Sequence, residues 1–112
     1  MIIEKFLIHY LTDALALPAY AEKPLRPPES FLVVDKLGSS VDNLIISSSV
    51  AIQSYGRSRL EAAELNETVK QVMEALPERP EISRCKLNSD YPYTDTETKR
   101  NRYQAVFDIT HY

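Results

Sequence analysis

The residues that could carry covalent chemistry are few. The chain contains one cysteine, Cys85, and two histidines, His9 and His111. A thiol beside an imidazole can act as a nucleophile and its base, and Cys85 and His111 would be neighbours if the strands that contain them pair. No third residue that would orient the imidazole can be identified. We therefore interpret Cys85 as a small buried apolar residue that alternates with Leu87, and we expect no catalytic residue; a small thiol hydrolase is the enzymatic alternative.

Metal and cofactor sites are not expected either. A metal ion needs clustered imidazole, thiolate or carboxylate groups, whereas His9, Cys85 and His111 fall on three different predicted elements. The only glycines are Gly38 and Gly56, and a phosphate-binding loop needs several glycines so that its backbone N–H groups can approach the phosphates. The sequence predicts no metal and no cofactor.

A basic and aromatic group of residues lies ahead of the last predicted strand. Lys99, Arg100 and Arg102 form its basic part, and Tyr91 and Tyr93 could stack on bases. However, the formal net charge is −3 and acidic residues interrupt the same segment. A nucleic-acid-binding module is therefore a disfavoured alternative to a solvated or protein-contacting loop.

Composition indicates an ordinary globular protein. Its 112 residues suit one domain spanning 1–112, with 44% hydrophobic and 26% charged residues. A single cysteine excludes an intrachain disulfide. Charged residues interrupt the apolar N-terminal segment, so we expect neither a signal peptide nor a membrane span, and folding in the cytosol.

The first half of the chain predicts one helix and two strands. Apolar residues repeat with helical spacing over residues 2–17, and Pro18 marks the end of that helix. The proline-rich segment Pro18–Pro28 should be an extended connector. Ser30–Leu37 predicts a strand whose early part is apolar on both faces, and therefore covered on both. The alternating segment Leu44–Ser54 predicts a second strand, joined to the first across a turn at Gly38–Asn43.

A second helix is expected after Gly56. Ser58 followed by Glu61 matches a capping box, in which each side chain satisfies the other residue's exposed backbone N–H. The helix would end before Pro77, and its buried stripe comprises Ala62, Leu65, Val69, Val72, Met73 and Leu76.

Two further strands are expected at Ile82–Asn88 and 103–111, separated by a long polar loop, Ser89–Arg102. The element order is then helix-strand-strand-helix-strand-strand. The sequence predicts an α+β fold, with two helices packed on one face of a roughly four-stranded, mainly antiparallel sheet.

Several segments resemble the tail-terminator, or tail-completion, proteins of long-tailed bacteriophages. They are IQSYGRSRLEAAELNETVKQVMEAL, the following IS, the region around SDYPYTD, and RYQAVFDI. The resemblance covers most of the chain from Phe31 onward and, more loosely, the first helix. Its motifs are patterns of packing and turns, not a catalytic signature.

The resemblance implies a structural virion protein and not an enzyme. Such proteins form a ring, usually a hexamer, on the head-proximal end of the tail tube, where they stop tube growth and meet the head connector. The implied partners are other copies of the chain, the tail-tube protein and a head connector or neck protein. The implied location is the head–tail junction of the virion, after assembly in the host cytoplasm. The structural alternative is a neck or head-completion protein that binds the head connector.

A ring requires two different patches on each subunit. We expect these contacts in the Ser89–Arg102 loop and the Gly38–Asn43 turn, while a partner-free mobile loop is the alternative. Arg57 and Arg59 could pair with Glu61 or Glu64 of a neighbouring subunit, or be solvated. The candidate contact residues are Asp42, Arg57, Arg59, Glu61, Glu64, Tyr91, Tyr93, Lys99, Arg100 and Arg102.

Overall fold

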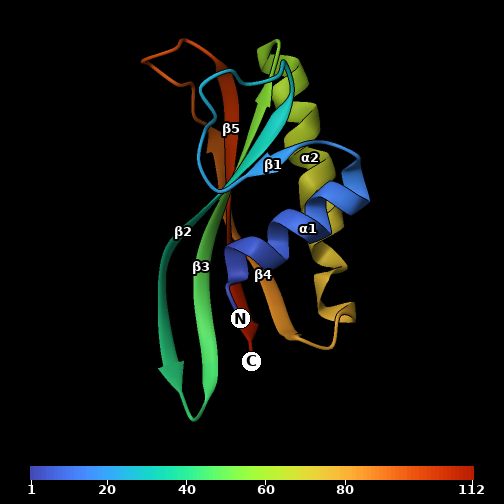
Figure 1. The fold of residues 1–112 in the computed structure, drawn as a ribbon, viewed down its shortest axis with the longest axis vertical. Helices are drawn as coiled ribbons and strands as arrows, with labels where there is room; N and C mark the ends of the chain where they lie inside the picture. The colour runs from blue at the N-terminus through green and yellow to red at the C-terminus, as the bar shows by residue number, and fades with distance from the viewer.

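The computed structural model describes residues 1–112 and contains two α-helices, one short 3-10 helix and five strands (Figure 1). In chain order the elements are α1 (Ile3–Leu15), β1 (Ala19–Tyr20), β2 (Phe31–Asp42), β3 (Ile45–Gly56), α2 (Arg59–Glu74), η1 (Leu76–Glu78), β4 (Ile82–Pro92) and β5 (Asn101–His111).

The strands form one mixed sheet in the order β1-β2-β3-β5-β4. β1 runs parallel to β2, and the other neighbours are antiparallel. The predicted α+β class is confirmed, but the expected four-stranded sheet is wrong in detail because β1 adds a fifth strand. β1 has only two residues, which pair with Leu32 and Val33. A strand this short has no alternation by which the sequence could reveal it.

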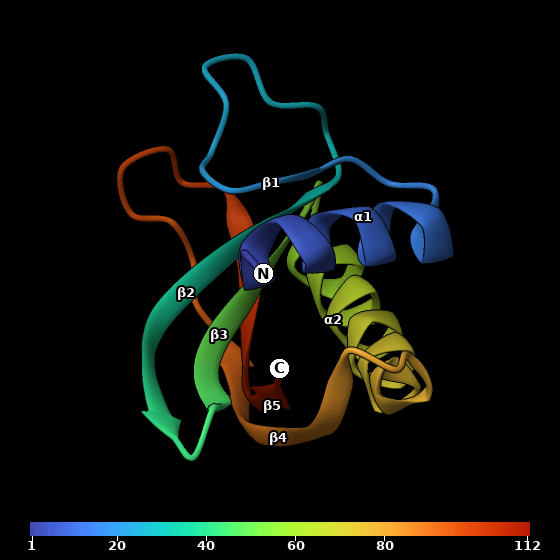
Figure 2. The ribbon, with the colours of Figure 1, turned by 60° about the horizontal axis from the view of Figure 1, so that its bottom comes forward.

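Both helices cover the same face of the sheet, as Figure 2 shows for α1 and α2. The main core lies between them and that face. It takes side chains from both helices, from η1 and from every strand but β1, and its buried members are Ile3, Leu7, Leu11, Leu32, Val34, Val50, Ile52, Val69, Met73, Leu76, Ile82, Ala105, Phe107 and Ile109.

The opposite face of the sheet carries a smaller aromatic cluster. Phe31 and Tyr55 stack with ring centroids 4.3 Å apart, and Val33 is buried beside them. The residues Phe31 to Val34 are therefore all buried, half on each face. This confirms that the start of the first predicted strand is covered on both sides.

The helices begin and end for local reasons. In α1 the backbone leaves the helix at Ala16, which has a φ of 53° and donates its N–H to the carbonyl of Thr12. At the start of α2 the Ser58 hydroxyl accepts the N–H of Glu61 at 3.1 Å, as predicted. The reciprocal half of the capping box differs, because the Glu61 carboxylate accepts hydrogen bonds from Ser30 and Arg57. α2 also ends at Glu74, slightly earlier than predicted.

The β2–β3 hairpin is longer than expected, and the predicted turn at Gly38–Asn43 is wrong. β2 continues to Asp42, and the turn consists of Asn43 and Leu44 alone. Both have positive φ, 49° and 68°, as a type I′ hairpin turn requires. The serines of this segment resemble turn residues in sequence, yet they pair across the two strands, for example Ser39 with Ser48.

The predicted loop Ser89–Arg102 is also wrong in extent. β4 continues to Pro92 and β5 begins at Asn101, so the connection is only residues 93–100. The ladder extends into that connection, because the N–H of Tyr93 donates to the carbonyl of Arg102 at 2.9 Å. Polar residues on an exposed edge strand hide this continuation from a hydrophobicity pattern.

Candidate interaction site

The end of the β2–β3 hairpin is an arm that extends beyond the ends of β4 and β5 (Figure 1). We define the arm as residues 41–46, which begin at the pair Val41 and Ile46. β5 accompanies β3 only as far as the pair Ile46 and His111, and every residue from Asp35 to Ile45 is exposed. The arm therefore contributes little to the core, and another reason is needed for its length.

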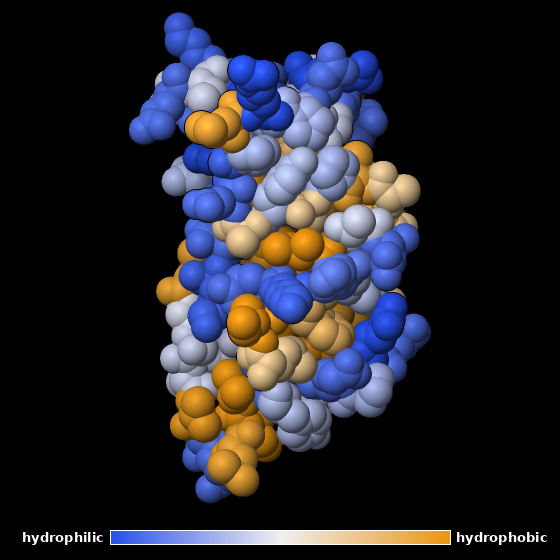
Figure 3. Space-filling model, viewed as in Figure 1, coloured by the Kyte–Doolittle hydropathy of each residue, from blue (hydrophilic) through white to orange (hydrophobic).

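The tip of the arm is apolar. Val41, Leu44 and Ile45 have exposed fractions of 67%, 88% and 42%. Figure 3 shows apolar residues gathered at this end of the molecule. Soluble monomers rarely expose large contiguous apolar patches, so clustered exposed apolar side chains often mark an interaction surface. The arm tip is thus the strongest candidate contact surface in the chain.

Leu44 occupies an unfavourable backbone conformation. Its φ of 68° lies in the left-handed region, where a bulky side chain costs about 1–2 kcal/mol and glycine is preferred. Burial of the side chain does not compensate for this cost, because Leu44 is the most exposed of the three apolar tip residues. A leucine at this position is explained better by a contact outside the subunit than by folding.

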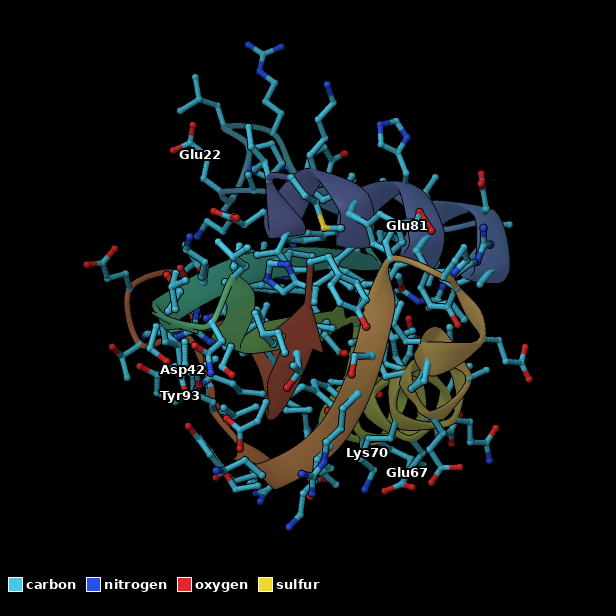
Figure 4. The ribbon with its side chains drawn as sticks, turned by 90° about the horizontal axis from the view of Figure 1, so that it is seen from below. Glu22, Asp42, Glu67, Lys70, Glu81 and Tyr93 are labelled. Carbon is cyan, nitrogen blue, oxygen red and sulfur yellow. The ribbon has the colours of Figure 1, made fainter.

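Asp42 gives the arm tip a negative charge. This carboxylate takes part in none of the ion pairs and side-chain hydrogen bonds of the chain, which lie elsewhere. Figure 4 places Asp42 on the opposite side of the molecule from Glu81, which follows η1. The structure brings this predicted contact residue to a free, projecting position.

A second surface lies between α1 and η1. It is a groove of about 300 Å³ lined by Met1, Ile2, Lys5, Phe6, His9, Tyr10, Asp13 and Arg79. The Tyr10 hydroxyl donates to the carbonyl of Val72 at 2.7 Å, and the guanidinium of Arg79 lies 5.2 Å from the centre of the Tyr10 ring. These contacts hold the groove's floor in place while Met1 and Ile2 remain exposed.

The predicted ion-pairing residues near the start of α2 divide into two groups. Arg57 pairs within its own chain, with Glu61 at 2.9 Å and with Glu29 at 3.5 Å. Hydrogen bonds from Ser30 and then Arg57 lower the pKa of Glu61. Arg59 and Glu64 are exposed and have no ion-pair partner in the subunit, so they remain available to a neighbour.

The predicted aromatic and basic contact residues lie together but are largely used in folding. Arg102 donates to the carbonyl of Tyr93 at 2.6 Å and to the hydroxyl of Tyr55 at 2.8 Å, and it lies 4.2 Å from the centre of the Tyr93 ring. Arg100 donates to the carbonyl of Glu29 at 2.7 Å. These guanidinium groups fasten the 93–100 connection and the proline-rich connector to the sheet.

Two members of that group are less engaged. The hydroxyl of Tyr91 accepts a hydrogen bond from Gln104 at 2.6 Å, and its ring packs edge-on against Tyr93. Lys99 is exposed, with a φ of 58°, and forms no ion pair. This end of the sheet offers one free cation and the edges of two tyrosine rings.

Cys85 and His111 lie on neighbouring strands, as their pairing required. However, Cys85 is opposite Ile109, whereas His111 is opposite Ile82. Burial, and then the charge of Asp108, raises the pKa of the Cys85 thiol to about 12. His111 is buried and its Nε2 lies 2.9 Å from the hydroxyl of Ser48. The thiol therefore stays protonated near neutral pH, where it is a poor nucleophile.

No group of three or more histidine, cysteine, aspartate or glutamate residues is arranged to hold a metal ion. None of the helices is long and apolar enough to cross a membrane. A search with models of protein families and a search of curated proteins found no match for the chain. Its function is therefore inferred from the sequence and from the surfaces described above.

Sequence reasoning placed a contact surface at Gly38–Asn43, but it missed the apolar residues Leu44 and Ile45 of the arm tip and it missed the α1–η1 groove. The signal for the tip was present in the segment VDNLII, in which Val41, Leu44 and Ile45 lie close to Asp42 and Asn43, residue types that are common in turns. The groove left no local signal, because Arg79 and Tyr10 are far apart in sequence and meet only in the folded chain.

Proposed function

We propose that this protein is a structural component of a long-tailed bacteriophage virion, a tail terminator that caps the tail tube. It acts as a ring of identical subunits, usually six in such proteins, at the head–tail junction, and it carries out no catalysis. The ring halts polymerisation of the tail-tube protein and presents its other side to the head connector. Assembly takes place in the host cytoplasm.

The observation that carries the proposal is the arm. It adds little to the core, yet it ends in three exposed apolar side chains, Val41, Leu44 and Ile45. A protein that works by assembling needs such a surface, whereas an enzyme needs a site with convergent reactive groups. The segments around Gly56, Tyr91 and Tyr103 resemble tail terminators, and this resemblance supports a cap on the tail tube as the particular assembly.

The proposal is tested by polymerising the tail-tube subunit of the same virion with and without this protein. Tubes of limited length in its presence, with the protein detected at one end by gold labelling, are the expected result. Tubes that lengthen without limit at saturating protein contradict the proposal.

A head-completion protein is the alternative that the same experiment can distinguish. Such a protein binds the purified head connector and leaves tail-tube growth unchanged. Pull-down with the connector and with the tube subunit, in parallel, separates these two assignments.

A further inference from the structure

We infer that the arm tip of one copy of this chain inserts into the α1–η1 groove of a second copy, and that this contact joins neighbouring subunits. The inference rests on the proposed function for the biological setting, a ring of identical subunits. The surfaces themselves are defined by the structure alone.

The two surfaces match in their apolar residues. Leu44 and Val41 project from the tip with exposed fractions of 88% and 67%. The groove is lined by the apolar residues Met1, Ile2 and Phe6 and by Tyr10. Two exposed apolar surfaces of this kind gain free energy when each covers the other.

The two surfaces are also complementary in charge. The tip carries the carboxylate of Asp42, and the groove carries the cations of Lys5 and Arg79, with Asp13 as its one acidic residue. None of these four side chains forms an ion pair inside the subunit; the five ion pairs of the chain involve other residues. Opposite charges at the rim would select and orient the docking arm.

The positions of tip and groove favour a contact between copies. The arm extends from the lower end of the molecule, away from α1 (Figure 1), and none of its residues lines the groove, so the arm does not fill the groove of its own chain. Tip and groove are different surfaces, and a contact between them is therefore heterologous. Such contacts close into a ring when the rotation between copies divides a full turn, which suits the proposed function.

Edge-to-edge pairing of sheets is a weaker way to join copies. β4 is an edge strand, but its register shifts twice, between Ile82 and Arg84 and between Leu87 and Ser89. β2 has a further shift between Lys36 and Gly38 in its pairing with β3. Bulges and charged residues on an edge are features that block strand addition.

Leu44→Gly is the most informative single variant, because it removes the apolar side chain and relieves the positive φ. The variant should be at least as stable as the parent, while self-association measured by light scattering or sedimentation weakens about tenfold or more. Leu25→Ser is the matched control, since Leu25 is fully exposed elsewhere and its loss should leave association unchanged. Association that survives Leu44→Gly intact would contradict the inference.

The charge pairing is tested by exchange. Asp42→Lys and Lys5→Glu should each weaken association, and the double variant, in which the charges are swapped, should recover part of it. Lys86→Glu, on β4 away from both surfaces, is the control. Two single variants with additive losses and no recovery in the double variant would show that Asp42 and Lys5 do not meet.

Cross-linking separates failure of this interface from failure of the proposed function. In a Cys85→Ala background, Leu44→Cys and Ile2→Cys are combined and oxidised, both in the free protein at high concentration and in the presence of tail tubes. A ladder of covalent multimers in the double-cysteine protein, absent from each single-cysteine protein, is expected. Capped tubes without a ladder would contradict the proposed interface but not the proposed function. Uncapped tubes with a ladder would support the interface and contradict the function. Absence of a ladder in both preparations would contradict the interface.

Discussion

Gly56 is where the backbone of β3 comes closest to α2. A Cβ atom built on it would lie 2.6 Å from the backbone nitrogen of Ala62 and 3.0 Å from the Ala62 Cα. Both are backbone atoms of the capped first turns of α2, so they cannot move aside without shifting the helix. The absence of a side chain at Gly56 thus sets the spacing between strand and helix.

We predict that Gly56→Ala lowers the free energy of unfolding by about 1–3 kcal/mol, the usual range for overpacking, measured by chemical denaturation. The control is Gly38→Ala, because no other atom lies within 4 Å of the position that its added methyl group would occupy. That variant should change stability by less than about 0.5 kcal/mol. Equal effects of the two substitutions would contradict the proposed role of Gly56.

Asp95 fastens the 93–100 connection to the proline-rich connector. Burial opposes its ionisation, but hydrogen bonds from Lys23, from Thr98 and from the backbone N–H of Glu97 outweigh that effect and lower the pKa of Asp95 to about 2. The ion pair with Lys23 has an N–O distance of 3.1 Å. One carboxylate therefore holds two segments that are far apart in sequence.

The pKa of Asp95 is lower in the folded protein than in the unfolded chain. Asp95 therefore stabilises the fold at pH values above its pKa in the unfolded chain. That stability is lost as the pH falls from about 4 to about 2. We predict that Asp95→Asn costs about 1–2 kcal/mol at neutral pH and flattens this part of the pH profile. The stability of parent and variant is measured by thermal unfolding across this pH range. Parallel pH profiles for the two proteins would contradict the proposed role of Asp95.

At the scale of elements, a polar contact joins α2 to β4. The carboxylate of Asp90 accepts hydrogen bonds from Asn66 at 2.9 Å and from Lys70 at 3.0 Å. Lys70 also pairs with Glu67 at 2.8 Å, and both are labelled on α2 in Figure 4. Asn66 is buried among the apolar residues of α2, so its amide depends on Asp90.

We predict that Asp90→Ala destabilises the protein by about 1–3 kcal/mol, because it leaves the buried Asn66 amide without an acceptor. The comparison is Asn88→Ala, which removes an exposed hydrogen bond to Asp108 of 3.1 Å and should cost less than about 0.5 kcal/mol. Hydrogen exchange should also show faster opening of α2 in Asp90→Ala. A loss no larger than that of the control would mean that solvent satisfies Asn66.

The elements differ in how far they could be predicted from the sequence, for physical reasons. α2 was predictable because its cap at Ser58 and its buried residues Val69 and Met73 are local features of the chain. β1 was not, because two residues show no alternation, and the far halves of β2 and β4 were not, because they are exposed and most of their residues are small or polar. Hydrophobic periodicity in a sequence reflects the burial of one face of an element. It therefore does not reveal an exposed strand that is held in the sheet only by pairing with its neighbouring strands.

The same distinction applies to the candidate site. Asp42 was identified from sequence as a surface residue and does lie at the arm tip. Arg100 and Arg102 were identified for their charge, but they are engaged by backbone carbonyl groups of the same chain. A sequence shows which residues are able to form contacts. The fold determines which of them are engaged within the subunit and which remain free for a partner.

At the scale of the whole molecule, the two helices and one sheet face form the core, and the hairpin arm extends from it (Figures 1 and 2). The overall extents are 43 × 24 × 24 Å, with the hairpin along the long direction. The body is stabilised by its own packing, whereas the arm tip has apolar side chains with no partner in the subunit. This shape supports the proposal that the protein functions by assembling with other copies of itself.

The most direct test of the central claim is the length of tail tubes, measured by electron microscopy, as this protein is added to their polymerising subunit. Capping predicts that tubes stop growing and that further subunit adds nothing to tubes that carry the protein at one end. Leu25→Ser should cap as the parent does. Tubes that keep growing at both ends in the presence of excess protein would contradict a capping role.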